Sequence, residues 1–138
     1  MAETVYTNCY LSLNAVDISA LIKSISINRN PDMKDNTRMG HTGKSRKKGL
    51  DDWSFDIELL DDFTDDAVDE DLWTLFDAGT TFVIIWKPVN TTTGAGNPRY
   101  YGTGIIESFP LGGAVGDLAT KKIRVVAAGT ALTRAITD

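Results

Sequence analysis

Residues 53–60 have the sequence Trp-Ser-Phe-Asp-Ile-Glu-Leu-Leu, and this stretch decides the fold class. Apolar and polar side chains alternate along it, which is the period of a β-strand with one buried face and one solvated face. The acidic side chains of Asp56 and Glu58 fall on the solvated face. The stretch therefore predicts a strand whose core residues are Trp53, Phe55 and Ile57.

An amphipathic helix is expected next, over residues 68–78. Leu72, Leu75 and Phe76 recur at helical spacing and make one apolar stripe together with Val68. Asp65 or Asp66 is expected to cap its start, and Asp69 and Glu70 suit the positive end of the helix dipole. Gly79 suits the left-handed residue that ends a helix.

The remaining apolar runs predict further strands. Residues 10–18 suit a small hairpin, and strands are expected at 22–27, 99–109 and 121–128. The run 82–86 is apolar without alternation, which indicates a central strand covered on both faces. Its expected core residues are Val83 and Ile85.

The resulting fold class is β-dominated α+β within a single domain, residues 1–138. We expect an antiparallel β-sandwich or barrel of six to seven strands, with one flanking helix and a long loop between early strands. Residues 130–138 are small and polar and suit an extended C-terminal tail.

The long loop, residues 29–50, is the most unusual segment. It contains Pro31, Gly40, Gly43 and Gly49 and few apolar residues, so no regular structure is expected in it. Such a loop is usually functional or disordered. It carries seven basic residues against two acidic ones: Arg29, Lys34, Arg38, Lys44, Arg46, Lys47 and Lys48.

The segment after the loop has the opposite sign. Residues 51–71 contain eleven acidic residues and no basic one, within a chain of net charge −5. Adjoining segments of opposite charge are more informative than the net value. The candidate acidic surface complementary to the loop comprises Asp61, Asp62, Asp65, Asp66, Asp69 and Glu70.

No catalytic, metal or cofactor site is predicted. His41 is the only histidine and has no cysteine or histidine cluster near it, as zinc or a nucleophile–histidine pair would require. The Gly43-Lys44-Ser45 sequence lacks the upstream glycine of a phosphate-binding loop. Cys9 is the only cysteine and is expected to be a small buried residue. No run suits a membrane helix, and the N-terminal sequence does not resemble a secretory signal, so synthesis in the cytoplasm is expected.

Three functions remain open for the charged segments. The cluster from Lys44 to Lys48 would suit a nucleic-acid-binding module, although the loop has no aromatic residues for base stacking. A small hydrolase with paired carboxylates in a cleft would suit any acidic protein. A subunit with a positive arm and a negative flank is also complementary to its own copy placed head to tail, which builds rings or stacks. We favour this third function.

The order of the elements resembles the major tail tube proteins of long-tailed bacteriophages, and of related gene transfer agents and contractile tails. The resemblance covers nearly the whole chain and begins with a short N-terminal hairpin. Its motifs are the long loop at 29–50, Trp53-Ser54-Phe55-Asp56-Ile57, the helix ending in Leu72-Trp73-Thr74-Leu75-Phe76-Asp77-Ala78-Gly79, Asn97-Pro98-Arg99-Tyr100-Tyr101-Gly102-Thr103-Gly104, and Val115-Gly116-Asp117.

The resemblance implies a non-enzymatic structural protein of the virion tail. Copies would form hexameric rings whose inner sheets join into one barrel, and the rings would stack into a tube for genome delivery. The loop at 29–50, residues 2–7 and residues 130–138 would contact neighbouring rings, and the helix would lie outside the barrel or against the adjacent subunit. Asp56 and Glu58 are candidates for the lumen, through which DNA would pass.

The implied partners are other copies of the chain, the tape-measure protein, the tail terminator and the distal tail proteins. A tail terminator or a capsid decoration protein is the alternative within the same class. We also expect the loop at 29–50 to be disordered in the free subunit and to become ordered when rings stack.

Overall fold

The computed structural model describes residues 9–60 and 68–137, with the side chains of Val68 and Asp69 left aside. Within these residues the elements are β1 (Tyr10–Leu13), β2 (Val16–Asp17), η1 (Ser19–Leu21), β3 (Ile22–Arg29), β4 (Met33–Asp35), β5 (Arg46–Lys48), β6 (Trp53–Leu60), α1 (Val68–Ala78), β7 (Phe82–Lys87), β8 (Arg99–Ser108), β9 (Thr120–Ala127) and β10 (Thr133–Ala135). The β-dominated fold with one flanking helix is confirmed.

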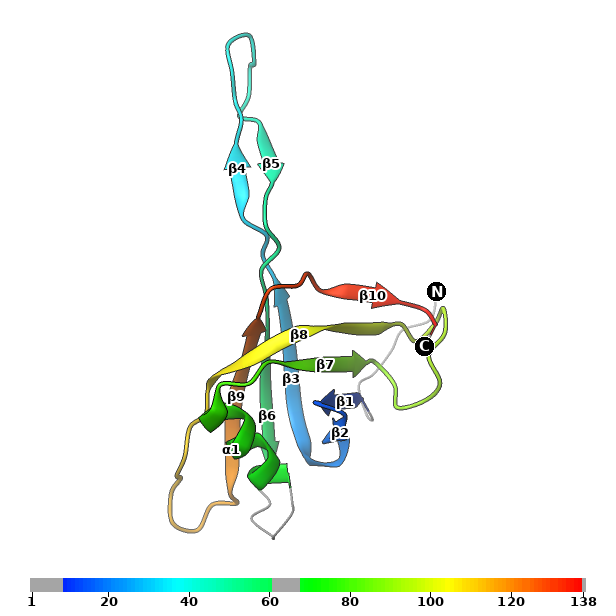
Figure 1. Cartoon of the computed structure of the whole chain (residues 1–138), viewed down its shortest axis with the longest axis vertical. Coiled ribbons are helices and arrows are strands. Elements are labelled where there is room, and N and C mark those ends of the chain that lie inside the picture. The colour runs from blue at the N-terminus through cyan, green and yellow to red at the C-terminus, as the bar shows by residue number, and fades with distance from the viewer. Residues whose placement is uncertain (1–8, 61–67, 138) are drawn as a thin grey trace.

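Eight of these strands form one antiparallel sheet. Seven of them follow the order β2-β1-β7-β8-β9-β6-β3, and β10 is the eighth. The short β10 pairs with the beginning of β8, on the edge that β9 occupies further along. Figure 1 shows β3, β6 and β9 running along the long axis, whereas β7, β8 and β10 cross it. The sheet therefore bends into two crossing parts around a common core, with β3 at one end of the strand order.

Trp53 lies at the centre of this core. Its side chain is 1% exposed, and its indole Nε1 donates to the carbonyl oxygen of Thr130 at 2.9 Å. The ring packs directly on β8, because a Cβ added at Gly102 would lie 2.7 Å from Trp53 Cζ2. At Gly104 an added Cβ would lie 2.7 Å from Val125 Cγ1 and 3.2 Å from the indole. The two glycines of β8 thus allow the close approach expected of glycine within a strand.

The helix α1 buries Leu72 and Leu75 against the sheet, while Phe76 is half-buried. It ends at Gly79, which has φ +64°. The N–H of Gly79 donates to Phe76 O at 3.2 Å, and that of Thr80 donates to Leu75 O at 3.3 Å. This is a Schellman ending, as the glycine predicted. The expected caps at Asp65 and Asp66 lie outside the described residues. At 11 residues α1 is too short to cross a bilayer, and no other described helix is long and apolar enough to do so.

The expectation that β7 is covered on both faces is wrong for the single chain. Phe82 and Ile84 are buried, but Val83 is 45% exposed and Ile85 is only half-buried. The strand lies between β1 and β8 and turns one face to the core, so alternate residues point outward despite the uniform apolar sequence. Of the other expected core residues, Trp53, Phe55, Ile57, Leu72 and Leu75 are buried.

The expectation of no regular structure across residues 29–50 is also wrong. These residues form an arm built on the hairpin of β4 and β5, in which Met33 faces Lys48 and Asp35 faces Arg46. The arm extends from the end of the molecule away from α1 (Figure 1). Its ladder joins backbone groups and buries no apolar face, so the apolar pattern from which strands are predicted is absent.

Candidate assembly surfaces

The arm continues the ladder between β3 and β6 beyond the body of the protein. After the Arg29–Trp53 pair, Asn30 N donates to Asp52 O and Asp32 N donates to Leu50 O, both at 2.8 Å. Gly49 N also donates to Asp32 O, at 2.6 Å, so one residue on the first strand faces two on the second. This is a β-bulge, which bends and twists a hairpin locally. A Cβ at Gly49 would lie 2.7 Å from Asp32 O, so the close approach requires glycine.

The base of the arm is fixed by Asp51. The Nε of Arg29 donates to both carboxylate oxygens of Asp51, at 2.9 and 3.0 Å. The backbone N–H of Leu132 donates to the same carboxylate at 3.2 Å, which ties the C-terminal segment to the arm. The Arg29 hydrogen bond is the main reason that the pKa of Asp51 lies below its ordinary value, and burial opposes it.

The turn at the tip of the arm is held by polar contacts. Thr37 N donates to Asp35 Oδ1 at 2.9 Å, which lowers the pKa of Asp35. Ser45 N donates to Thr37 Oγ1 at 2.7 Å, and Arg38 N donates to His41 Nδ1 at 3.3 Å. His41 therefore has a local structural contact in an exposed turn, and within the described residues no group of three or more His, Cys, Asp or Glu side chains could hold a metal ion.

The basic residues of the arm are mostly free of acidic partners. Arg29 pairs with Asp51, and Lys34 Nζ lies 2.6 Å from Asp32 Oδ2. Five others are exposed and make no ion pair with any described residue: Arg38, Lys44, Arg46, Lys47 and Lys48. Met39, at the tip, is fully exposed as well. The arm thus presents uncompensated positive charge with an apolar side chain at its tip.

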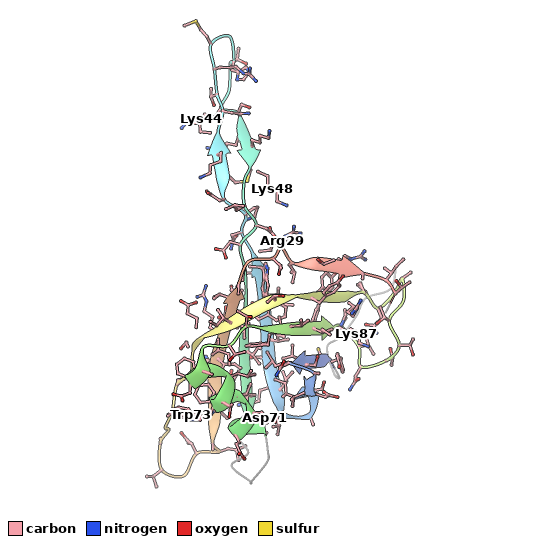
Figure 2. The ribbon with its side chains drawn as sticks, viewed as in Figure 1. Arg29, Lys44, Lys48, Asp71, Trp73 and Lys87 are labelled. Carbon is pink, nitrogen blue, oxygen red and sulfur yellow. The ribbon has the colours of Figure 1, made fainter. Side chains whose placement is uncertain are left out.

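The candidate acidic surface falls mainly outside the described residues. Asp61, Asp62, Asp65 and Asp66 are not described, and Asp69 is placed only as a residue of α1. Glu70 and its neighbour Asp71 are exposed on α1. Figure 2 shows Lys44 and Lys48 near one end of the long axis and Asp71 near the other. Within one chain, these cationic and anionic groups are therefore far apart.

The candidate lumen residues lie on a polar face formed by β3, β6 and β9. Asp56 faces Arg124 on β9, and Glu58 faces Lys122. Lys23 Nζ lies 3.7 Å from Glu58 Oε1, and Arg124 Nε lies 3.2 Å from Glu107 Oε2. The acidic side chains are therefore matched by basic ones on the same face, which the sequence of the single strand 53–60 did not indicate.

An aromatic patch lies at the α1 end of the molecule. It consists of Trp73, Phe76 and Phe109, with ring centroids 5.5 to 6.3 Å apart. Trp73 remains 45% exposed. The loop between β8 and β9 continues the apolar surface with three exposed side chains, Leu111, Val115 and Leu118. The sequence did not indicate this patch, because exposure of an apolar side chain depends on what the rest of the fold leaves uncovered.

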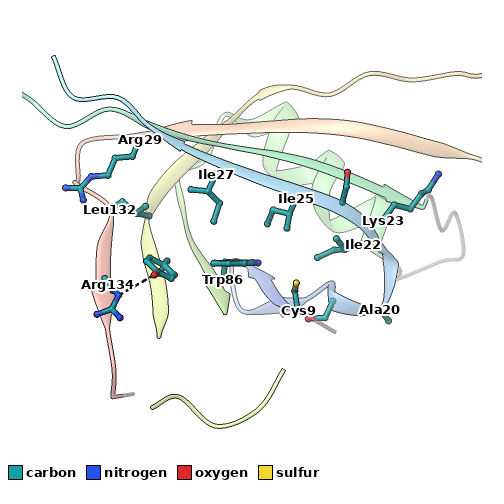
Figure 3. Close-up of a pocket in the computed structure, with 13 residues that line it drawn as sticks. Cys9, Ala20, Ile22, Lys23, Ile25, Ile27, Arg29, Trp86, Leu132 and Arg134 are labelled. Carbon is teal, nitrogen blue, oxygen red and sulfur yellow. Dashed lines mark hydrogen bonds between the residues drawn. The ribbon is translucent and has the colours of Figure 1, made fainter. Parts of the chain in front are cut away.

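A large pocket lies between β3 and the crossing strands. It has a volume of about 890 Å³ and an apolar lining from Ile22, Ile25 and Ile27 of β3, Trp86 of β7 and Leu132. In Figure 3 the isoleucines and Trp86 face one another across it. Cys9 also lines this β3 pocket and is half-buried, not fully buried. The lining residues come from distant parts of the chain, so no local sequence signal would have found the pocket.

The fold of this chain matches that of one chain in each of two solved particle structures. A chain of the virion of a native gene transfer agent superposes with a TM-score of 0.74 and 18% identity, over 95% of this chain and 99% of that one. This chain has the fold of a gene transfer agent protein. A chain from the tail of an empty gene transfer agent particle, with C6 symmetry, gives a TM-score of 0.69 and 19% identity over 91% and 92% of the two chains. No family model and no curated protein matches the sequence.

These likenesses confirm the resemblance to gene transfer agent proteins that the order of elements indicated. They extend over nearly the full length of both chains, so the arm, the bent sheet and α1 belong to one shared architecture. At 18% and 19% identity the shared property is the fold.

Proposed function

We propose that this chain is a non-enzymatic structural subunit of a virion tail tube, in which copies form rings and the arm joins one ring to the next. The single observation that carries the proposal is the arm itself. It extends from the body, covers no core, and exposes five basic side chains that pair with no described residue. The likeness to a tail with C6 symmetry supports this function and favours a hexameric ring.

Stacking follows from the placement of charge at the two ends of the molecule. The basic arm lies at one end, and α1 with Glu70 and Asp71 lies at the other. Copies placed head to tail therefore bring the arm of one subunit to the acidic end of the next. A heterologous contact of this kind repeats without limit unless a terminator blocks it, which suits a tube.

Ring closure follows from the open edge of the sheet. In the described part of the chain β3 pairs only with β6, so its other edge presents unpaired backbone groups. An edge of eight residues is a site for pairing with a strand of another chain. Joining such edges between subunits would produce a continuous barrel.

In such a barrel the polar face of β3, β6 and β9 would line the lumen, with Asp56 and Glu58 on it. The basic partners Arg124 and Lys122 balance these acids. A lumen with little net charge would neither hold DNA nor repel it strongly, and this suits passage of a genome or of a tape-measure protein.

Charge reversal on the arm tests the function. The variant Lys44→Glu/Lys47→Glu should form rings but not rods in negative-stain micrographs, because ring contacts lie in the body and stacking contacts lie in the arm. Lys87→Glu, at the partly buried end of β7 away from the arm (Figure 2), is a control for charge reversal outside the arm and should still form rods. Rods of normal length from the arm variant would contradict the proposal, and wild-type particles that stop at one ring would favour a tail terminator.

A nucleic-acid-binding module is the second candidate, favoured by the same five basic side chains on a two-stranded ribbon. It predicts that the isolated subunit binds duplex DNA with an affinity that falls steeply as salt rises. Reversal of Lys44 and Lys47 would then abolish DNA binding, whereas a tube subunit would show no specific retention of DNA in the same assay.

A further inference from the structure

We propose that the aromatic patch of one copy docks in the β3 pocket of the next copy within a ring. This inference rests on the proposed function, since it names the contact that closes the ring. It assigns the pocket a protein partner, a second copy of this chain, and not a small ligand.

The β3 pocket has the properties of a receiving surface. Ile22, Ile25 and Ile27 on β3 are only partly buried, although they lie on the core side of the sheet. Trp86 faces them from β7 (Figure 3). The pocket runs beside the unpaired edge of β3, so a neighbour that pairs with this edge would also cover the isoleucines. The pocket is therefore continuous with the surface proposed for ring closure.

The aromatic patch has the properties of the inserting surface. Trp73 leaves nearly half of its side chain exposed on α1, and Leu111, Val115 and Leu118 extend the apolar area. Tryptophan is enriched among the residues that dominate interface energies, typically at the centre of an interface. Exposed apolar side chains that gather at one end of a monomer mark an interaction site.

The charges around the two surfaces are complementary. Lys23, Arg29 and Arg134 lie at the pocket. Lys23 pairs with Glu58 and Arg29 with Asp51, so among the described residues Arg134 is the pocket cation without an ion pair. Around the patch, Asp77 is exposed on α1 and Asp117 is exposed on the loop, whereas Glu70 and Asp71 are the residues proposed above to receive the arm. Lys121 also lies at the patch, but its side chain is buried, with Nζ 4.0 Å from the Phe109 ring centroid. Acidic side chains beside the apolar patch are therefore complementary to the cationic side chain of Arg134 beside the apolar pocket.

The positions of the two surfaces suit a ring. In Figure 1, α1 lies to one side of β3, whereas β1 and the end of β7 lie to the other. The two surfaces are different parts of the chain, so each subunit can use both at once. A heterologous contact between two sides of a subunit closes a ring when its rotation allows.

Cys9 supplies a direct readout, because it lines the pocket and is the only cysteine in the chain. Its alkylation by iodoacetamide should be at least tenfold slower in assembled rings than in dilute subunits. Trp73→Ala should weaken ring assembly by about tenfold or more and restore the fast alkylation rate. Val83→Ala, at an apolar residue with the same exposure outside both surfaces, should leave assembly and alkylation as in the wild type.

A mixing experiment distinguishes this contact from general loss of folding. Trp73→Asp removes the patch, and Ile25→Asp removes the pocket, so neither variant should form rings alone. Mixed together they retain one intact interface, and sedimentation should show a one-to-one dimer. Circular dichroism of each variant checks that it is folded, and Ile25→Ser replaces Ile25→Asp if the charge unfolds the chain.

The outcomes separate the two proposals. Wild-type rings with unchanged Cys9 reactivity, or rings unaffected by Trp73→Ala, would overturn this inference and leave the tail tube function standing. Absence of any ring or rod from wild-type protein would overturn the proposed function itself.

Discussion

Arg29 and Asp51 hold the base of the arm together, with the Arg29 Nε 2.9 Å from Asp51 Oδ1. The same carboxylate accepts a hydrogen bond from the Leu132 N–H. One side chain therefore joins the hairpin of β3 and β6, the arm and the segment that leads to β10. This carboxylate therefore links the base of the arm to the body of the protein.

The first prediction concerns pH. The pKa of Asp51 lies below its ordinary value of 3.8 in the folded chain, mainly because of Arg29. Its contribution to stability is therefore fully present above about pH 3.8 and is lost as the pH falls through the lower folded value. Asp51→Asn should lower the thermal midpoint at pH 7, and the difference from wild type should shrink below pH 3.8. Asp52→Asn is the control. A difference that stays constant down to low pH would contradict the role of the ion pair.

The second prediction concerns Gly104 of β8, which packs closely against β9 and the Trp53 indole. A Cβ at Gly104 would lie 2.7 Å from Val125 Cγ1 and 2.9 Å from Val126 O. Gly104→Ala should therefore lower the free energy of unfolding by about 1–3 kcal/mol, because the core is overpacked. Gly113→Ala, where an added Cβ meets nothing within 4 Å, should change it little. Denaturant unfolding measures both, and equal stabilities would show that β8 can move away from the indole.

The fold could be predicted from the sequence only where the sequence pattern reports burial or a special backbone conformation. Strand 53–60 was predictable because its alternation reports burial of one face, and the end of α1 was predictable because Gly79 adopts a left-handed conformation that few other residues favour. Val83 was misplaced because an apolar run does not reveal whether a second layer covers it. The β4–β5 hairpin was missed because its ladder joins mostly charged residues and has no buried apolar face.

The assembly surfaces were predictable only in part. The charge of the arm is visible in the sequence, since its basic residues are close together along the chain. The β3 pocket is not, because Cys9, Ile25, Trp86 and Leu132 meet only through the bend of the sheet. The balance of charge on the polar face likewise depends on the register that sets Arg124 against Asp56.

The third prediction concerns order in the arm. A two-stranded hairpin without a packed face is marginally stable in water, so the arm should open readily in the free subunit. Trypsin should therefore cleave after Arg38, Lys44 or Lys48 in dilute protein at least tenfold faster than in assembled rods. Mass spectrometry of the fragments identifies the sites, with cleavage after Lys122 of β9 as the internal control. Equal rates in the two states would contradict a role for the arm in stacking.

The fourth prediction concerns salt. Stacking that depends on exposed charges should weaken as the screening length falls from about 10 Å at 0.1 M to about 3 Å at 1 M salt. The ring contact is largely apolar and should persist over this range. Light scattering should therefore show rods separating into rings at high salt, and reassembly on dilution. Rods that remain intact at 1 M salt would show that stacking does not depend on the charge of the arm.

The most direct test of the whole account is negative-stain electron microscopy of the purified wild-type chain at high concentration. The account predicts hollow rods with a regular axial repeat and six-fold end views, because every copy carries both a basic arm and the surfaces that receive its neighbours. Particles that remain single subunits at every protein and salt concentration would contradict it.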